Sequence, residues 1–133
     1  MGVEILQAGA PPPTLQLQFL AADADLESAD GVGYITIPKA LDGYRLAFAT
    51  ATVGAGSTSG PVGLDIQRLS DNESLFSAGM VIAEGDLSTR DGTAPVIVEA
   101  YAQVAEGQLL RVDCDEPGTG VTGPAWVELQ FAR

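Results

Sequence analysis

Apolar and polar residues alternate along most of this chain. Alternation with a period of two is typical of β-strands that have one buried and one solvent-facing side. Gly, Pro, Asp and Asn separate the alternating segments at intervals of roughly 8–12 residues, as in proteins built of short antiparallel strands. We therefore predict an all-β antiparallel β-sandwich of jelly-roll type. The clearest strand segments are residues 14–20, 34–37, 44–53, 62–66, 110–114 and 127–131.

The longest of these segments, residues 44–53, has two unequal sides. One side carries Leu46 and Phe48 together. A narrow alanine side suits the close approach of a second layer or of another subunit. This side carries Ala47, Ala49 and Ala51.

Residues 98–106 show the only helical period in the chain. Val98, Tyr101 and Ala105 fall on one helical face, and a glycine follows as a stop signal. A strand that begins at Val96 competes for the same residues, so the chain is expected to hold at most one short helix.

The N-terminal residues have a different character. Three successive prolines, Pro11, Pro12 and Pro13, impose an extended backbone and remove hydrogen-bond donors. We therefore divide the chain into an extended arm, residues 1–13, and one β-sandwich domain, residues 14–133. A total of 133 residues is enough to bury the core of one such domain.

Charge narrows the range of partners. Eighteen Asp and Glu face six Lys and Arg, which gives a formal net charge of −12. Such a surface repels phosphate backbones, so no nucleic-acid partner is expected. The apolar runs are too short to span a bilayer and no secretion-signal pattern opens the chain, so no membrane partner is expected either.

The sequence offers few residues for the common kinds of catalytic site. The chain has no histidine and one cysteine, which excludes a Ser-His-Asp triad, a Cys-His pair and a tetrahedral zinc site. Cys114 is in register with apolar neighbours and is expected to be buried. Asp113 and Asp115 are expected on the solvent side of their strand, too exposed for glycosidase chemistry. The protein is therefore predicted to be no enzyme, with no catalytic and no cofactor-binding residues.

Two loops contain motifs that resemble ligand-binding sites. Residues 118–123 spell G-x-G-x-x-G, but a strand follows in place of the helix that a dinucleotide site requires, so we interpret them as an inter-strand loop. The second loop clusters carboxylates that leave room for a calcium ion, although it lacks the Gly and the final Glu of an EF-hand. Its candidate ligands are Asp23, Asp25, Glu27 and Asp30.

Trp126 stands out among the strand residues. If Val127, Leu129 and Phe131 face inward, then Trp126 faces outward on the same side as Glu128. An outward tryptophan is typical of a contact surface, so Trp126 and the three prolines of the arm are the candidate interface residues.

Several segments resemble a β-sandwich domain of tailed-bacteriophage virion proteins. An Ile37-Pro38 strand end and the strand of residues 46–53 add to this similarity. The resembling segments include Val62-Gly63-Leu64-Asp65-Ile66, Leu75-Phe76-Ser77, residues 80–84, Thr93-Ala94-Pro95-Val96-Ile97, Val112-Asp113-Cys114-Asp115, Gly118-Thr119-Gly120 and residues 127–131.

The resemblance implies a non-enzymatic structural protein of a virion. The chain lacks the long fibre segments of tail adhesins, which favours a decoration (cement) protein on the capsid exterior. The resemblance also implies a homotrimer that binds the major capsid protein, at the capsid surface after synthesis in the host cytoplasm. The alternative is a tail fibre or baseplate domain that binds host surface glycan, with Trp126 or Tyr101 as a stacking platform.

Overall fold

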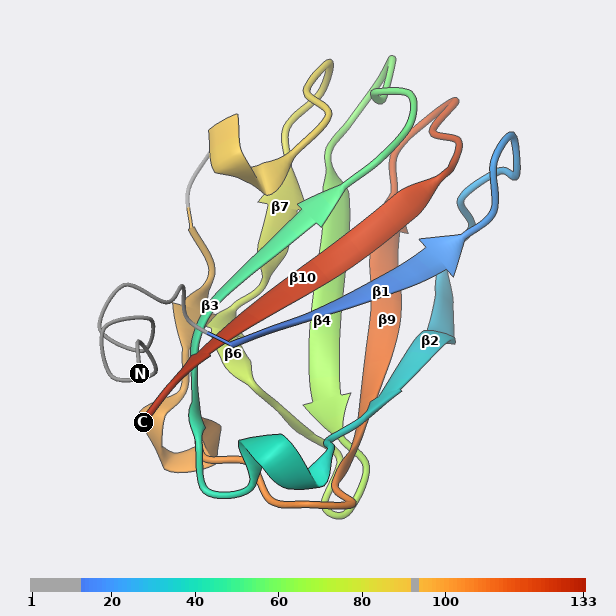
Figure 1. Ribbon diagram of the computed structural model, residues 1–133. Coiled ribbons are helices and arrows are strands. Elements are labelled where there is room, and N and C mark those ends of the chain that lie inside the picture. The colour runs from blue at the N-terminus through green and yellow to red at the C-terminus, as the bar shows by residue number, and fades with distance from the viewer. Residues whose placement is uncertain (1–12, 92–93) are drawn as a thin grey trace, which may run out of the picture.

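The protein is a sandwich of two antiparallel β-sheets, seen in a computed structural model that describes residues 13–91 and 94–133. The front sheet has the strand order β1, β10, β3; the back sheet has the order β2, β9, β4, with β5 and β7 beside β4, and β6 pairs with β8 (Figure 1). The predicted all-β sandwich is confirmed. The strands are β1 Thr14–Leu20, β2 Ala29–Thr36, β3 Arg45–Thr52, β4 Val62–Arg68, β5 Glu73–Ser74, β6 Phe76–Ala78, β7 Met80–Ile82, β8 Val96–Ile97, β9 Leu109–Pro117 and β10 Ala125–Ala132.

The strand pairs are nested in the way that defines a jelly roll. Strand β1 pairs with β10, β2 with β9, and β4 with β7. Strand β3 completes the series through bridges from Thr52 to Ser88 and from Arg45 to Gln103, so two later segments lie along its outer edge. The chain is thus one long hairpin wrapped into two sheets.

The core lies between the two sheets. In β10 the inward residues Val127, Leu129 and Phe131 are fully buried, and Trp126, Glu128 and Gln130 between them are only partly buried. The same alternation fills the back sheet, so burial of apolar area holds the layers together. The back-sheet residues are Val62, Leu64, Ile66, Leu110, Val112 and Cys114.

A register shift corrects the prediction for the longest strand. The pairing of β10 with β3 shifts between Gln130 and Phe131, which lie opposite Phe48 and Leu46. A bulge of this kind moves the following residues to the other side of the sheet. Leu46 is therefore buried, but Phe48 lies on the outer side and is partly exposed. Of the three alanines, Ala49 and Ala51 face the core and Ala47 is exposed.

The helix predicted over residues 98–106 is wrong. Only Glu99–Tyr101 (η3) forms a short 3-10 turn, after strand β8. Beyond it the backbone bonds to the start of β3: Leu46 N–H donates to Ala102 O (2.8 Å) and Val104 N–H donates to Tyr44 O (2.8 Å). These long-range bonds replace the i to i−4 bonds that a helix needs. The other turns are Lys39–Leu41 (η1) and Thr89–Asp91 (η2), and no helix in the described ranges has the length and apolar character of a membrane span.

The G-x-G-x-x-G segment connects β9 to β10, as predicted. A Cβ added at Gly123 would lie 2.0 Å from the carbonyl oxygen of Ala21, so only glycine fits where these two loops touch. Gly118 and Gly120 have positive φ angles, 63° and 72°. The three glycines therefore serve loop packing at the end of the sandwich.

Candidate functional site

The outer side of the front sheet presents polar side chains in register around one tryptophan. Trp126 and Glu128 are two residues apart on the central strand β10, so both point outward. Their pairing partners on β1 and β3 extend the same side into two rows across three strands. The rows are Gln18, Trp126, Thr52 and Gln16, Glu128, Thr50.

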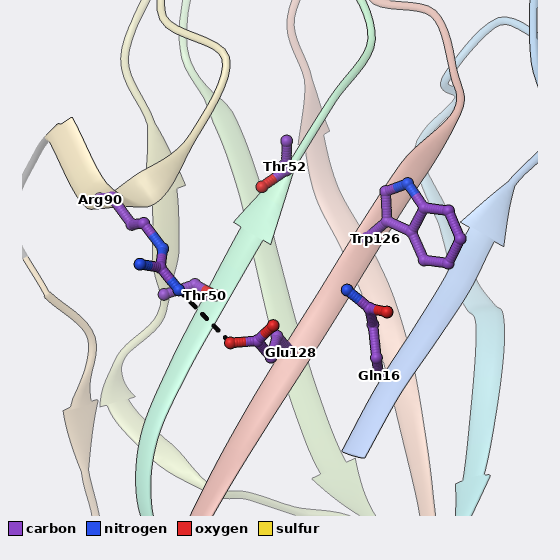
Figure 2. Close-up of a pocket in the computed structure, with 6 residues that line it drawn as sticks. All are labelled: Gln16, Thr50, Thr52, Arg90, Trp126 and Glu128. Atoms are coloured by element: carbon purple, nitrogen blue, oxygen red, sulfur yellow. Dashed lines mark hydrogen bonds and ion pairs between the residues drawn. The ribbon is translucent and has the colours of Figure 1, made fainter. Parts of the chain in front are cut away.

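A pocket of about 210 Å³ opens on this surface. Figure 2 shows the indole of Trp126 extended toward β1 with the Gln16 amide beside it, and Glu128 between β1 and β3. The pocket is lined by Gln16, Thr50, Thr52, Arg90, Trp126 and Glu128.

Arg90 reaches this pocket from the 3-10 turn η2, which is fixed against the edge of β3. Ser88 pairs with Thr52, and the buried Thr89 hydroxyl accepts a hydrogen bond from Ala51 N–H (3.1 Å). These contacts hold the turn in place, and the Arg90 guanidinium extends from it over the sheet. Its Nη2 lies 3.4 Å from Glu128 Oε1, an ion pair that closes one side of the pocket (Figure 2).

The lining favours recognition over catalysis. Glu128 is the only carboxylate among the six lining residues, and it is paired with Arg90. A glycosidase needs two carboxyl groups, and nucleophilic catalysis needs a nucleophile next to a base. The pocket instead combines an aromatic ring with amide, hydroxyl, carboxylate and guanidinium groups, which together donate and accept hydrogen bonds. The outward orientation predicted for Trp126 is observed, and its role in an interface stays a prediction.

The back sheet corrects the placement of Asp113. This residue is buried, with 1% of its surface exposed, although we predicted that it faces solvent. Arg111 Nε donates to its Oδ1 (2.7 Å), Arg111 Nη2 donates to its Oδ2 (3.0 Å), and Gly31 N–H donates to its Oδ1 (2.9 Å). The alternation pattern did not predict the burial of Asp113, because alternation does not show that a long arginine side chain on the same side of the strand can cover a paired carboxylate.

Asp115 is exposed, as predicted, but its surroundings are acidic. Partial burial of the carboxyl group, followed by the charges of Asp65, Asp113, Asp30 and Glu116, raises the pKa of Asp115 above its ordinary value. A raised pKa means that the folded chain binds this proton more tightly than the unfolded chain, so ionised Asp115 reduces stability at neutral pH.

We expect Asp115→Asn to raise Tm at pH 7, by an amount that disappears as the pH falls below the ordinary pKa of aspartate, where Asp115 is protonated in both states. Thermal unfolding at pH 7 and at about pH 3 measures this difference. Asp25→Asn, in an exposed loop, removes the same charge and serves as the control. An equal gain from both variants would attribute the effect to net charge alone.

Cys114 is buried, as predicted, with 1% of its surface exposed. Burial, followed by the charge of Asp115, raises the pKa of the Cys114 thiol to about 11. We expect the Cys114 thiol of the native protein to stay largely unreacted when a disulfide reagent is added at pH 8 for minutes. In denaturant the same thiol should react completely. Rapid native reaction would contradict the inward position of this residue.

The remaining predicted site residues do not converge. The four candidate calcium ligands (Asp23, Asp25, Glu27 and Asp30) are all exposed, and Asp30 lies 4.0 Å from Arg111 Nη2. Among the residues that the structure describes, no three His, Cys, Asp or Glu form a group that could hold a metal ion.

Tyr101 and the three prolines of the arm are the other residues that the sequence suggested as contact residues. Tyr101 is covered on one face by the Arg68 guanidinium, 4.3 Å from the ring centroid, which reduces its use as a stacking platform. Pro11 and Pro12 lie outside the described residues. Pro13 is exposed, and its carbonyl accepts a hydrogen bond from Phe131 N–H (2.9 Å).

Sequence reasoning identified Trp126 and its neighbour Glu128 but missed the other four lining residues. The alternation of residues 14–20 indicated that Gln16 and Gln18 face outward, yet it gave no strand partner for them. Arg90 carried no signal, because its position depends on how η2 docks against β3.

Comparison with known proteins adds no further identification: no family model matches this chain, and no curated protein matches it.

Proposed function

We propose that this protein is a non-enzymatic structural protein of a tailed-bacteriophage virion that decorates the exterior of the capsid. The observation that carries the proposal is the place of the resembling segments in the fold. They include β4 and β9 in the back sheet and β10, the central strand of the front sheet. The similarity to the virion domain therefore concerns the scaffold of the whole domain and not one loop.

The charge and the pocket chemistry support this proposal. A net charge of −12 favours solubility at high concentration, which a protein assembled in many copies needs before assembly. The pocket on the front sheet lacks the paired groups of a catalyst. We propose a homotrimer that contacts the major capsid protein, as the resemblance implies.

The test is co-sedimentation with capsids that lack this protein, together with light scattering of the purified protein. We expect saturable capsid binding, a trimeric mass, and weak capsid binding after removal of residues 1–12. This truncation leaves Pro13 and its hydrogen bond from Phe131 in place, so the β-sandwich should remain folded. A truncated protein that saturates capsids would contradict a role for the arm, and a full-length protein that does not bind capsids would overturn the decoration role.

The pocket beside Trp126 favours a second candidate function, a tail fibre or baseplate domain that binds host surface glycan. A partly exposed tryptophan surrounded by hydrogen-bonding side chains is suited to such a ligand. Immuno-electron microscopy of purified particles separates the two functions, because label on the head supports decoration and label on the tail supports glycan recognition.

A further inference from the structure

We infer that the pocket on the front sheet is a binding site for one pyranose ring of an uncharged saccharide. The inference deepens the second candidate function, glycan recognition, and does not depend on a capsid position. It assigns ligand-contact roles to Gln16, Glu128 and Arg90, with Trp126 as the platform for the ring.

The size of the pocket limits the ligand. Its volume is about 210 Å³, whereas pockets for drug-sized ligands hold roughly 300–1,000 Å³. A single sugar ring matches the smaller space, and the open outer side of the sheet leaves room for the rest of a glycan chain. A folded protein partner would contact a broad surface and would not need a pocket of this size.

The lining matches the two kinds of surface that a sugar presents. A pyranose ring has flat patches of C–H groups, which pack on an aromatic face, and a rim of hydroxyl groups, each of which both donates and accepts hydrogen bonds. Trp126 supplies the aromatic face. Its neighbours supply both donors and acceptors: the Gln16 amide, the Thr50 and Thr52 hydroxyls, the Glu128 carboxylate and the Arg90 guanidinium.

The charges select an uncharged ligand. Arg90 and Glu128 lie 3.4 Å apart, so together they contribute no net charge to the pocket. An anionic sugar would compete with Glu128 for Arg90 and would also approach a chain of net charge −12. A cationic sugar would compete with Arg90 for Glu128. A neutral sugar can accept from Arg90 and donate to Glu128 without separating the pair.

The site is also supported by rigid elements. Five of the six lining residues lie on paired strands of one sheet, and the sixth, Arg90, is carried by a turn that Thr89 attaches to β3. Preorganised side chains of this kind reduce the entropy that binding costs.

Trp126 is the only tryptophan in the chain, so its fluorescence and its indole N–H resonance report on this pocket alone. The full-length protein would be titrated with methyl glycosides of glucose, galactose, mannose, N-acetylglucosamine and N-acetylgalactosamine, and with glucuronate and glucosamine as charged probes. We expect at least one neutral glycoside to shift both signals with a dissociation constant of about 1–10 mM, as for a weak single-ring ligand.

Two glutamines on β1 provide a matched pair of variants. Gln16→Ala removes a lining residue and keeps the tryptophan reporter, so the dissociation constant should rise roughly tenfold. Gln18 lies on the same side of the same strand, opposite Trp126, but it does not line the pocket, so Gln18→Ala should bind as the unmodified protein does. The fold of both variants is checked by Tm.

Three outcomes would overturn the inference: no shift with any neutral glycoside, tighter binding of a charged probe, or equal binding by the two glutamine variants. A glycan array probed with the protein and with Gln16→Ala separates this inference from the second candidate function. Array binding that survives Gln16→Ala would support glycan recognition through another surface and exclude this pocket.

Discussion

Replacing Arg111 with methionine is expected to lower the free energy of unfolding by clearly more than the loss of an exposed ion pair does, because it leaves the Asp113 carboxylate buried without its counter-charge. The Asp113 side chain is only 2% exposed, and Arg111 is its nearest cation, at 2.7 Å. The hydrogen bond to Asp113, followed by the charges of Asp113 and Asp30, raises the pKa of Arg111 above its ordinary value even though burial acts in the opposite direction, so Arg111 stays ionised at neutral pH. Urea denaturation at pH 7 measures the loss.

Two variants make this result specific. Arg45→Met removes an exposed ion pair with Glu99, whose side chain is 83% exposed, and should cost no more than about 1 kcal/mol. Adding Asp113→Asn to Arg111→Met should recover most of the loss, because the amide oxygen still accepts from Gly31 N–H and no charge remains buried. A loss in Arg111→Met no larger than that in Arg45→Met would show that Asp113 does not depend on Arg111.

The general architecture was accessible from the sequence because alternation reports which strands have one buried side. Strands β1, β4, β9 and β10 were all indicated by their alternation, and the jelly-roll type followed from their number and spacing. The helix over residues 98–106 was not correctly predicted, since its periodicity was ambiguous and the hydrogen bonds from Leu46 and Val104 that decide it are long-range.

The candidate site was accessible only in part. Trp126 was identifiable because it falls out of phase with an apolar set on its own strand. The positions of Gln16 and Thr50 beside Glu128 depend on the registers of β10 with two strands that lie far from it in sequence. No periodicity within one segment encodes such a register, so the pocket emerges only when the sheet is assembled.

Phe131→Ala is expected to lower the free energy of unfolding by about 3–5 kcal/mol, because it leaves a cavity in the centre of the sandwich. Phe131 is completely buried, and it continues the inward set of Val127 and Leu129 on β10. The matched variant is Phe48→Ala on the neighbouring strand. Phe48 lies on the outer side and is partly exposed, so its removal should cost only about 1 kcal/mol.

This pair of variants tests the outward orientation of Phe48. Alternation from the inward Ala49 and Ala51 places Phe48 on the outer side of β3, opposite the outward Gln130, and the register shift changes only the side of Leu46. Equal losses for Phe131→Ala and Phe48→Ala in urea denaturation would therefore contradict the observed pairing. A large loss for Phe131→Ala alone would place Phe48 on the same outer surface as Thr50 and Thr52, where it borders the proposed saccharide site and not the core.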